Sequence, residues 1–262
     1  MKRIFDEKAL RDFLKSSETA DVFLLYGEEK YLVGKYTNAV INGANADELL
    51  RYNQESFDAD ELTDAVTMVP FGGGMRCIVI TDVDVDGMQR AEFGKLCDIL
   101  SQPMTLCRVI VSFPTLEFGL KSSQNSKKLI QLISENGICA ELKKRSEQDI
   151  ISFIEGKIKD SGCTVKRTVC AYLLSRCGYD MNLLSSEVDK LCAYRSGGEI
   201  TERDVDDIST ELLNASAFDI SKKLMAGDLG GALKKLSDLY ELREEPVAVL
   251  GALSTAFVDL YR

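Results

Sequence analysis

Asp21-Val-Phe-Leu-Leu-Tyr26 is followed at once by Gly27-Glu-Glu-Lys-Tyr-Leu-Val-Gly34-Lys35-Tyr36, and this stretch decides how the first half of the chain folds. The first run is short and almost wholly apolar, which is typical of a strand buried on both faces. The second run places apolar residues at helical spacing after a glycine, so it predicts a turn and then a helix. Repetition of this strand-then-helix pattern indicates a parallel sheet covered by helices.

Outward from this stretch, the pattern recurs over the first 142 residues. Apolar runs of strand length alternate with segments whose apolar residues recur at 3.6-residue spacing. The predicted strands are Asp21–Tyr26, Leu50–Ser56, Arg76–Thr81, Cys107–Ser112 and Ile138–Leu142. We therefore expect an α/β domain at residues 1–142.

From about residue 145 the strand pattern stops and every remaining segment has helical period. We expect helices at 146–160 and 166–177, a third starting at Asp180, and a capped start at Thr201-Glu-Arg-Asp204. The first three of these helices define a three-helix domain, to which we assign residues 143–210. Further amphipathic helices, one with Pro246 at its first position, predict a helical domain at 211–262. Its apolar face still runs at the last residues, so we expect that domain to be incomplete.

Composition excludes several classes of function. The chain has 262 residues and no histidine, which excludes imidazole-based catalysis and the commonest zinc and iron sites. The eight cysteines never form a C-x-x-C pair, so we interpret them as reduced core thiols and expect neither metal nor cofactor.

Charge and hydropathy bear on partners and location. A net charge of −10 is the wrong sign for a protein that holds duplex DNA unaided, so any DNA contact must be local or assisted, for example by Lys143-Lys144-Arg145. No run approaches the roughly 18 consecutive apolar residues of a membrane span. Charged residues interrupt the start of the chain too soon for the apolar segment of a signal peptide. We expect a cytoplasmic protein that has no membrane partner.

The turn after the first strand stands where a phosphate-binding loop would stand. Six residues separate Gly27 from Gly34, although such a loop has four between its glycines, and Tyr36 follows Lys35 where Ser or Thr should bind magnesium. Glu28 and Glu29 would also repel phosphates. A nucleotide-binding fold that has lost its chemistry is the interpretation that these departures favour.

Two further positions are weak candidates for nucleotide chemistry. Asp82 follows the predicted strand Arg76–Thr81 without the second carboxylate of a magnesium site. Ser175-Arg176-Cys177 resembles an arginine-finger tripeptide of ATPases. It lies in a predicted helix of the second domain, where a surface arginine at a helix C-terminus is the simpler interpretation.

The most unusual local feature is Thr67-Met-Val-Pro-Phe-Gly-Gly-Gly-Met75. Three consecutive glycines leave the backbone unrestrained, while Met68, Val69, Pro70 and Phe71 are apolar in a predicted turn. The segment is either a helix exit whose phenylalanine packs in the core or an exposed apolar plug for a partner's pocket. The residues alone leave both alternatives open.

The order of these features resembles the delta subunits of the bacterial DNA polymerase III clamp loader. The resemblance runs through the whole chain. It is carried by Leu25-Tyr-Gly-Glu-Glu-Lys-Tyr-Leu32, Pro70-Phe71 before Arg76, Gly178-Tyr-Asp-Met-Asn-Leu-Leu-Ser-Ser-Glu-Val-Asp-Lys-Leu191, Ile200-Thr-Glu-Arg-Asp-Val205, Ala217-Phe-Asp219 and Glu245-Pro246.

The resemblance implies an AAA+-like domain without ATPase activity, a three-helix lid and a C-terminal collar. It implies a DNA replication protein that binds and opens the sliding clamp (the beta subunit). Met68, Val69, Pro70 and Phe71 would form the clamp-binding wedge, although glycines stand after Phe71 where bulky or polar residues are usual. Through the collar the chain would join the tau/gamma and delta prime subunits and meet primer-template DNA within the assembly.

Two alternatives from other classes remain. One is an active AAA+-type nucleotide-dependent enzyme with an atypical phosphate site between Gly27 and Lys35. The other is a protein-interaction scaffold outside replication.

Overall fold

The first part of the chain is built on one parallel sheet of six strands in the order β1-β6-β2-β5-β4-β3. The computed structural model describes residues 4–70, 72–104, 106–119, 123–210, 213–241 and 243–261, and the chain divides into two compact units between Lys144 and Arg145. The strands are β1 (Ile4–Phe5), β2 (Val22–Tyr26), β3 (Glu48–Tyr52), β4 (Arg76–Thr81), β5 (Cys107–Ser112) and β6 (Ile138–Glu141).

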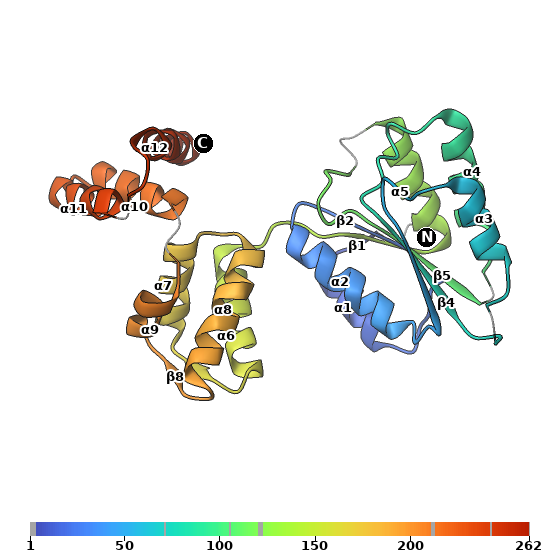
Figure 1. The fold of residues 1–262 in the computed structure, drawn as a ribbon, viewed down its shortest axis with the longest axis horizontal. Coiled ribbons are helices and arrows are strands. Elements are labelled where there is room, and N and C mark those ends of the chain that lie inside the picture. The colour runs from blue at the N-terminus through green and yellow to red at the C-terminus, as the bar shows by residue number, and fades with distance from the viewer. Residues whose placement is uncertain are drawn as a thin grey trace. The chain divides into compact units, whose positions relative to one another are not determined.

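The central strands lie between two layers of helices, which explains their nearly continuous apolar sequence. All five residues of β2 are buried, and so are the first five of β4. Helices α1 and α2 cover one face of the sheet, and α3, α4 and α5 cover the other (Figure 1). The five helices are α1 (Glu7–Lys15), α2 (Lys30–Gly43), α3 (Ala59–Thr67), α4 (Arg90–Ser101) and α5 (Gln124–Asn136).

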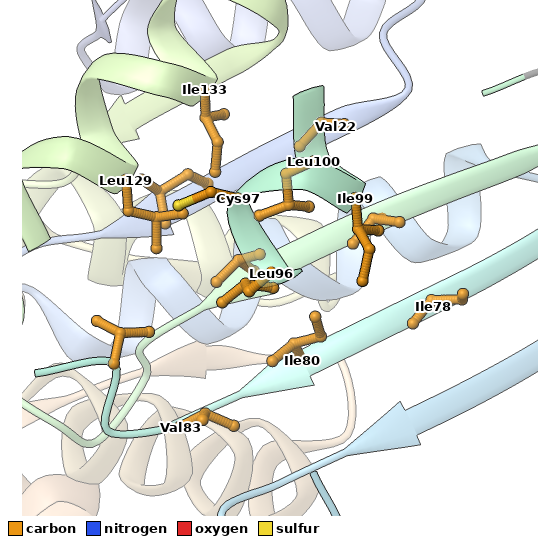
Figure 2. Close-up of a cluster of buried hydrophobic side chains, with 14 of the residues drawn as sticks. Val22, Ile78, Ile80, Val83, Leu96, Cys97, Ile99, Leu100, Leu129 and Ile133 are labelled. Atoms are coloured by element: carbon orange, nitrogen blue, oxygen red, sulfur yellow. The ribbon is translucent and has the colours of Figure 1, made fainter. Parts of the chain in front are cut away.

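The core under α3, α4 and α5 is aliphatic. Side chains of α4 and α5, among them Leu96, Leu100 and Leu129, pack on Ile78 and Ile80 of β4 (Figure 2). Each of these residues is at most 1% exposed. Burial of this kind is the main stabilising term of the unit.

The prediction of a parallel-sheet α/β part followed by a mainly helical part is confirmed, with changes in detail. The strand expected at Leu50–Ser56 is displaced to Glu48–Tyr52, because Asn53 starts a turn in which its side chain accepts the N–H groups of Glu55 and Ser56. The sequence also missed β1, whose two residues pair with β6 at the sheet edge and are too few to show a period.

The second unit is helical, as predicted, except for one small two-stranded parallel sheet. Its strands β7 (Thr164–Val165) and β8 (Glu199–Ile200) were not expected. Two residues each give no alternation to recognise. The helices are α6 (Glu147–Asp160), α7 (Arg167–Cys177), α8 (Met181–Arg195), α9 (Glu202–Ile208), α10 (Leu213–Met225), α11 (Leu229–Glu241) and α12 (Pro246–Tyr261).

The predicted helix starts are confirmed. The Asp180 carboxylate accepts the backbone N–H groups of two residues at the start of α8, and Pro246 is the first residue of α12. At α9 the Asp204 carboxylate accepts the backbone N–H and the hydroxyl of Thr201, both at 2.8 Å, and pairs with Arg195 at 2.6 Å. These contacts fix where each helix begins.

All eight cysteines are free and buried, as the apolar runs around them predicted. Burial is the largest cause that raises the pKa of Cys170 and of Cys177 to about 11. Their thiols therefore stay protonated at neutral pH and pack as small apolar groups in the core of α6 to α9.

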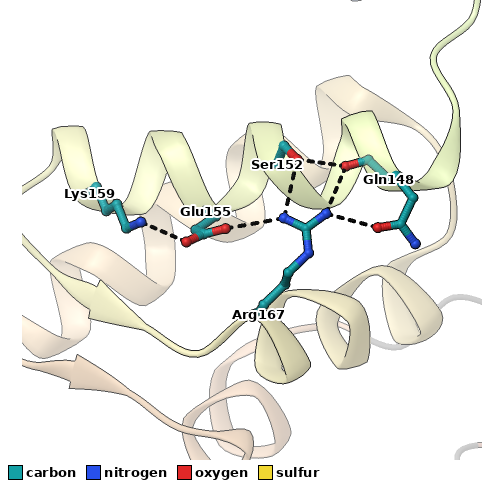
Figure 3. Close-up of polar contacts among 5 residues, drawn as sticks. All are labelled: Gln148, Ser152, Glu155, Lys159 and Arg167. Carbon is teal, nitrogen blue, oxygen red and sulfur yellow. Dashed lines mark hydrogen bonds and ion pairs between the residues drawn. The ribbon is translucent and has the colours of Figure 1, made fainter.

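An arginine at the start of α7 ties that helix to α6. The Arg167 guanidinium contacts the Gln148 side chain at 2.9 Å, the Ser152 hydroxyl at 3.2 Å and the Glu155 carboxylate at 3.3 Å (Figure 3). Lys159 contacts Glu155 from the other side and is the largest cause that lowers the pKa of this carboxyl group. The cluster fixes how α6 and α7 pack.

The last three helices share a much smaller core, centred on Ile220, Ala232, Leu239 and Val249. Several large apolar side chains of these helices stay exposed to solvent: Leu224, Met225, Leu229, Leu233, Tyr240, Val247, Leu250, Phe257 and Val258. Among the described residues, no helix combines the length and the apolar character needed to span a bilayer.

Candidate functional site

The turn after β2 lies where a nucleotide's phosphates would bind in a related fold, but its backbone is packed against its own chain. Gly27 has φ of +146°, and a Cβ at this position would lie 2.1 Å from the Leu142 carbonyl oxygen. The Glu29 N–H donates to that same oxygen at 3.0 Å. Close backbone packing therefore requires glycine at this position, and a phosphate ligand is not needed to explain it.

The second glycine of the candidate loop is not in a loop. Helix α2 begins at Lys30, so Gly34 and Lys35 lie inside the helix. A phosphate-binding loop needs its backbone N–H groups free before the helix starts. Here only Gly27, Glu28 and Glu29 separate the strand from the helix.

The first lysine of α2 is turned to carbonyl groups of the segment after β5. The Lys30 ammonium donates to the Phe113 carbonyl oxygen at 3.2 Å and also to the Leu116 carbonyl oxygen. Burial is the largest influence on its pKa and lowers it, against the opposing effect of nearby carboxylates. This lysine therefore serves the fold by tying two segments together.

Asp82, which directly follows β4, is bound to the same segment. Its carboxylate accepts the Thr115 N–H at 3.0 Å, the Thr115 hydroxyl at 2.8 Å and the Leu116 N–H at 2.9 Å. The residue has φ of +52°, which aspartate tolerates better than most side chains do. The polar groups at this edge of the sheet are thus used to bind one another.

Arg176, the arginine of the tripeptide near the end of α7, pairs with Asp206 of α9 at 3.0 Å. Asp206 also accepts the Tyr172 hydroxyl at 2.7 Å. Only 18% of the Arg176 side chain is exposed, so it is more covered than the surface arginine we expected. Its guanidinium holds α7 and α9 together.

The segment Met68–Met75 connects α3 to β4 and presents apolar side chains to solvent. Met68 is 63% exposed and Val69 is 70% exposed, although both are apolar. Pro70 is buried, and Phe71 lies outside the described residues. The alternative of core packing concerns Phe71 alone, so the exposure of Met68 and Val69 does not decide between the two interpretations.

The glycines after this segment make the chain turn back toward β4. Gly72 and Gly73 have φ of +93° and +77°, values that favour glycine, and the Gly73 N–H donates to the Pro70 carbonyl oxygen at 2.9 Å. Apart from chain neighbours, no atom of a described residue lies within 4 Å of a Cβ built at either position. The turn is open to solvent on this side.

Sequence reasoning missed the residues that hold this segment in place. Arg76 is 7% exposed and bonds to Glu48 of β3 and to the Met68 carbonyl oxygen. The Asp47 carboxylate accepts the Met75 N–H, and the Asp47 N–H donates to the Met75 carbonyl oxygen. An arginine at the start of an otherwise apolar strand was the available signal, because a buried guanidinium needs acceptors.

Comparison with known proteins identifies relatives along nearly the whole chain. The family model described as "DNA polymerase III, delta subunit" matches residues 23–136. A probable DNA polymerase III subunit delta of Aquifex aeolicus is 26% identical over 247 residues, which cover 92% of this chain and 69% of the relative. The DNA polymerase III subunit delta of Bacillus subtilis is 22% identical over 257 residues, which cover 93% and 72%.

A solved structure shares the fold. The Bacillus subtilis DNA clamp loader delta protein matches with a TM-score of 0.65 at 19% sequence identity, over 94% of this chain and 75% of that chain. The sequence matches and the common fold agree with the order of features first seen in the sequence. The chain is thus similar to DNA polymerase III delta subunits over more than nine tenths of its length, and it shares the fold of a clamp loader delta protein.

Proposed function

We propose that this chain binds the DNA sliding clamp through Met68, Val69, Pro70 and Phe71 and opens the ring during clamp loading. The observation that carries the proposal is the exposure of Met68 and Val69 in a turn whose two ends are held by hydrogen bonds. Exposed apolar side chains at a fixed position are typical of binding hot spots, which fill a partner's pocket.

We further propose that the chain contributes no ATP hydrolysis of its own. Three features support this: the glycine pair does not form a loop, Lys30 is directed to carbonyl groups, and the Asp82 carboxylate already accepts three hydrogen bonds from its own chain. Phosphoryl transfer needs those same positions free to hold phosphates and magnesium. The energy for loading would come from other subunits of the assembly.

The exposed apolar residues of α10, α11 and α12 support a role for these helices in assembly. Side chains such as Met225, Leu233 and Val247 are each more than 60% exposed, which is unusual for a group of neighbouring helices in a monomer. We propose that this region packs against the tau/gamma and delta prime subunits, and that primer-template DNA is met within that assembly.

Clamp binding is tested by isothermal titration of the purified chain with a purified beta clamp. We expect saturable binding, and we expect the bound chain to speed release of the clamp from nicked circular DNA. Absence of binding would refute the proposal, and binding without faster release would refute ring opening.

The nucleotide-dependent enzyme is tested by titration with Mg-ATP. We expect no heat of binding in the micromolar range and no phosphate release by the isolated chain. Saturable micromolar binding would mean that the edge at Lys30 and Asp82 rearranges to form a working site.

A further inference from the structure

Arg76, the first residue of β4, reaches across to the end of α3. Its Nε and Nη2 atoms lie 2.8 and 2.7 Å from one carboxylate oxygen of Glu48. Its Nη1 atom donates to the Met68 carbonyl oxygen at 3.0 Å and also to the Ala65 carbonyl oxygen. With only 9% of its side chain exposed, the guanidinium is enclosed among these three acceptors.

The two carbonyl groups belong to the place where α3 ends. The last carbonyl oxygens of a helix have no partner within it, and a cation is favoured there by the helix dipole. Met68 leaves the helix with extended backbone, while its own N–H still donates to the Asp64 carbonyl oxygen at 2.9 Å. Arg76 therefore fixes the direction in which the chain departs at Met68.

The other end of the segment is held by an acidic residue. The Asp47 carboxylate accepts the Met75 N–H at 3.0 Å, and the Asp47 N–H donates to the Met75 carbonyl oxygen at 2.8 Å. A Cβ at Gly74 would lie 2.0 Å from that carboxylate, so glycine is required for this approach. Between the two anchors, Gly72 and Gly73 leave the backbone without side-chain restraint.

We propose that Arg76, held in place by Glu48, is a positioning residue that presents Met68 and Val69 to the sliding clamp in one orientation. This inference rests on the proposed function. A segment that contains consecutive glycines would lose conformational freedom on binding, and ordering it beforehand reduces that cost. Arginine suits the role because its planar guanidinium spreads five N–H donors over three nitrogen atoms, so it can pair with Glu48 on one side and donate to the carbonyl oxygens of α3 on another.

The test uses Arg76→Lys in the full chain, with two measurements. We expect clamp affinity to fall by a factor of about ten or more, in line with the effect of a preorganised contact. We also expect faster hydrogen exchange at the amides of Met68 and Met75, with little change in the core of the sheet. Glu48→Gln, which keeps an acceptor but removes the charge, should give a smaller change in the same direction and serves if the lysine variant folds poorly.

The matched control is Ile80→Val, a substitution at the far end of the same strand. It removes a buried methyl group and slightly lowers thermal stability without contacting the segment. Clamp affinity of this variant should equal that of the parent. Equal weakening in Arg76→Lys and Ile80→Val would show that affinity follows stability, and the positioning role would be wrong.

A double-mutant cycle separates positioning from a purely structural role. In the Met68→Ala, Phe71→Ala background, Arg76→Lys should weaken clamp binding by less than about threefold, because the side chains that it orients are gone. An undiminished tenfold loss in that background would overturn the inference, as would unchanged hydrogen exchange in Arg76→Lys. Failure of the parent chain to bind the clamp would refute the proposed function and with it the clamp-presenting role, whereas hydrogen exchange tests separately whether Arg76 anchors the segment.

Discussion

The two edges of the parallel sheet differ in how they use their side chains. At the carboxyl ends of β2, β4 and β5, charged groups are bound by their own chain, as Lys30 and Asp82 show. At the amino end of β4, a turn held by Arg76 exposes Met68 and Val69. In open α/β sheets, small ligands bind at the carboxyl edge.

The comparison bears on the proposal that this chain binds a protein partner and hydrolyses no nucleotide. Lys30 and Asp82 at the carboxyl edge bond to their own chain, whereas Met68 and Val69 at the opposite edge are exposed to solvent. In the function proposed above, the first edge serves the fold and the second serves the partner. If the two edges are as distinct as this, substitutions at one should change stability and substitutions at the other should change binding.

The largest effect is expected at Gly27. Gly27→Ala should lower the free energy of unfolding by about 3 kcal/mol or more, because its Cβ would overlap the Leu142 carbonyl group in a strained backbone conformation. Gly34→Ala is the matched control: the position lies inside α2 with open space around a Cβ, so this change should stabilise the chain by about 0.5–1 kcal/mol. Urea unfolding measures both, and similar effects at the two glycines would contradict the assignment of α2.

The next effect concerns binding at the opposite edge. Met68→Ala, Phe71→Ala should weaken clamp binding by a factor of roughly 30 or more, since two anchors are truncated. The melting temperature should stay within a few degrees of the parent, whereas a core phenylalanine would cost about 3–5 kcal/mol.

The control for this pair is Leu229→Ala, Val247→Ala, two residues of the second unit that are 63% and 82% exposed. That variant should bind the clamp like the parent. If the variant with both Met68 and Phe71 changed melts far below the parent, Phe71 is a core residue and its assignment to the clamp-binding wedge is wrong.

A smaller effect is expected at Asp82. Asp82→Ala should cost about 1–3 kcal/mol in unfolding free energy, because the N–H groups of Thr115 and Leu116 lose their acceptor. Clamp affinity, measured by titration at a temperature where the variant is fully folded, should be unchanged. A parallel loss of affinity would mean that the carboxyl edge takes part in binding.

The smallest effect is a pH dependence at the same edge. Burial raises the pKa of Asp86, but hydrogen bonds from Ser123 and Ser126 outweigh it, so the pKa is lowered on balance. A lowered pKa means that the stabilisation is fully present above the unfolded value, about 3.9, and is lost as the pH falls through the folded value.

Asp86→Asn should therefore be less stable than the parent at pH 7, by less than about 1 kcal/mol because the site is exposed to solvent, and the difference should shrink toward pH 3. Urea unfolding of both proteins at the two pH values measures this. A difference that grows on acidification would show that the Asp86 carboxylate is not stabilised by these hydroxyl groups.

Much of the fold could be predicted because its signals are local. The apolar run Asp21–Tyr26, the caps at Asp180 and Thr201, and Pro246 each act within a few residues, and the structure confirms them. The two-residue strands β1, β7 and β8 could not be predicted, since their pairing partners are distant in sequence and two residues show no period.

For the candidate site, the sequence by itself determined that an apolar segment precedes β4 and that the phosphate loop has the wrong spacing, because both are properties of consecutive residues. Only the tertiary structure decided that Met68 and Val69 are exposed and that Pro70 is buried. Only it brought Arg76 to Glu48 and to the end of α3, and Lys30 to Phe113, since these contacts join segments that the sheet places side by side. Exposure and long-range hydrogen bonding depend on the whole packed chain, which no local pattern encodes.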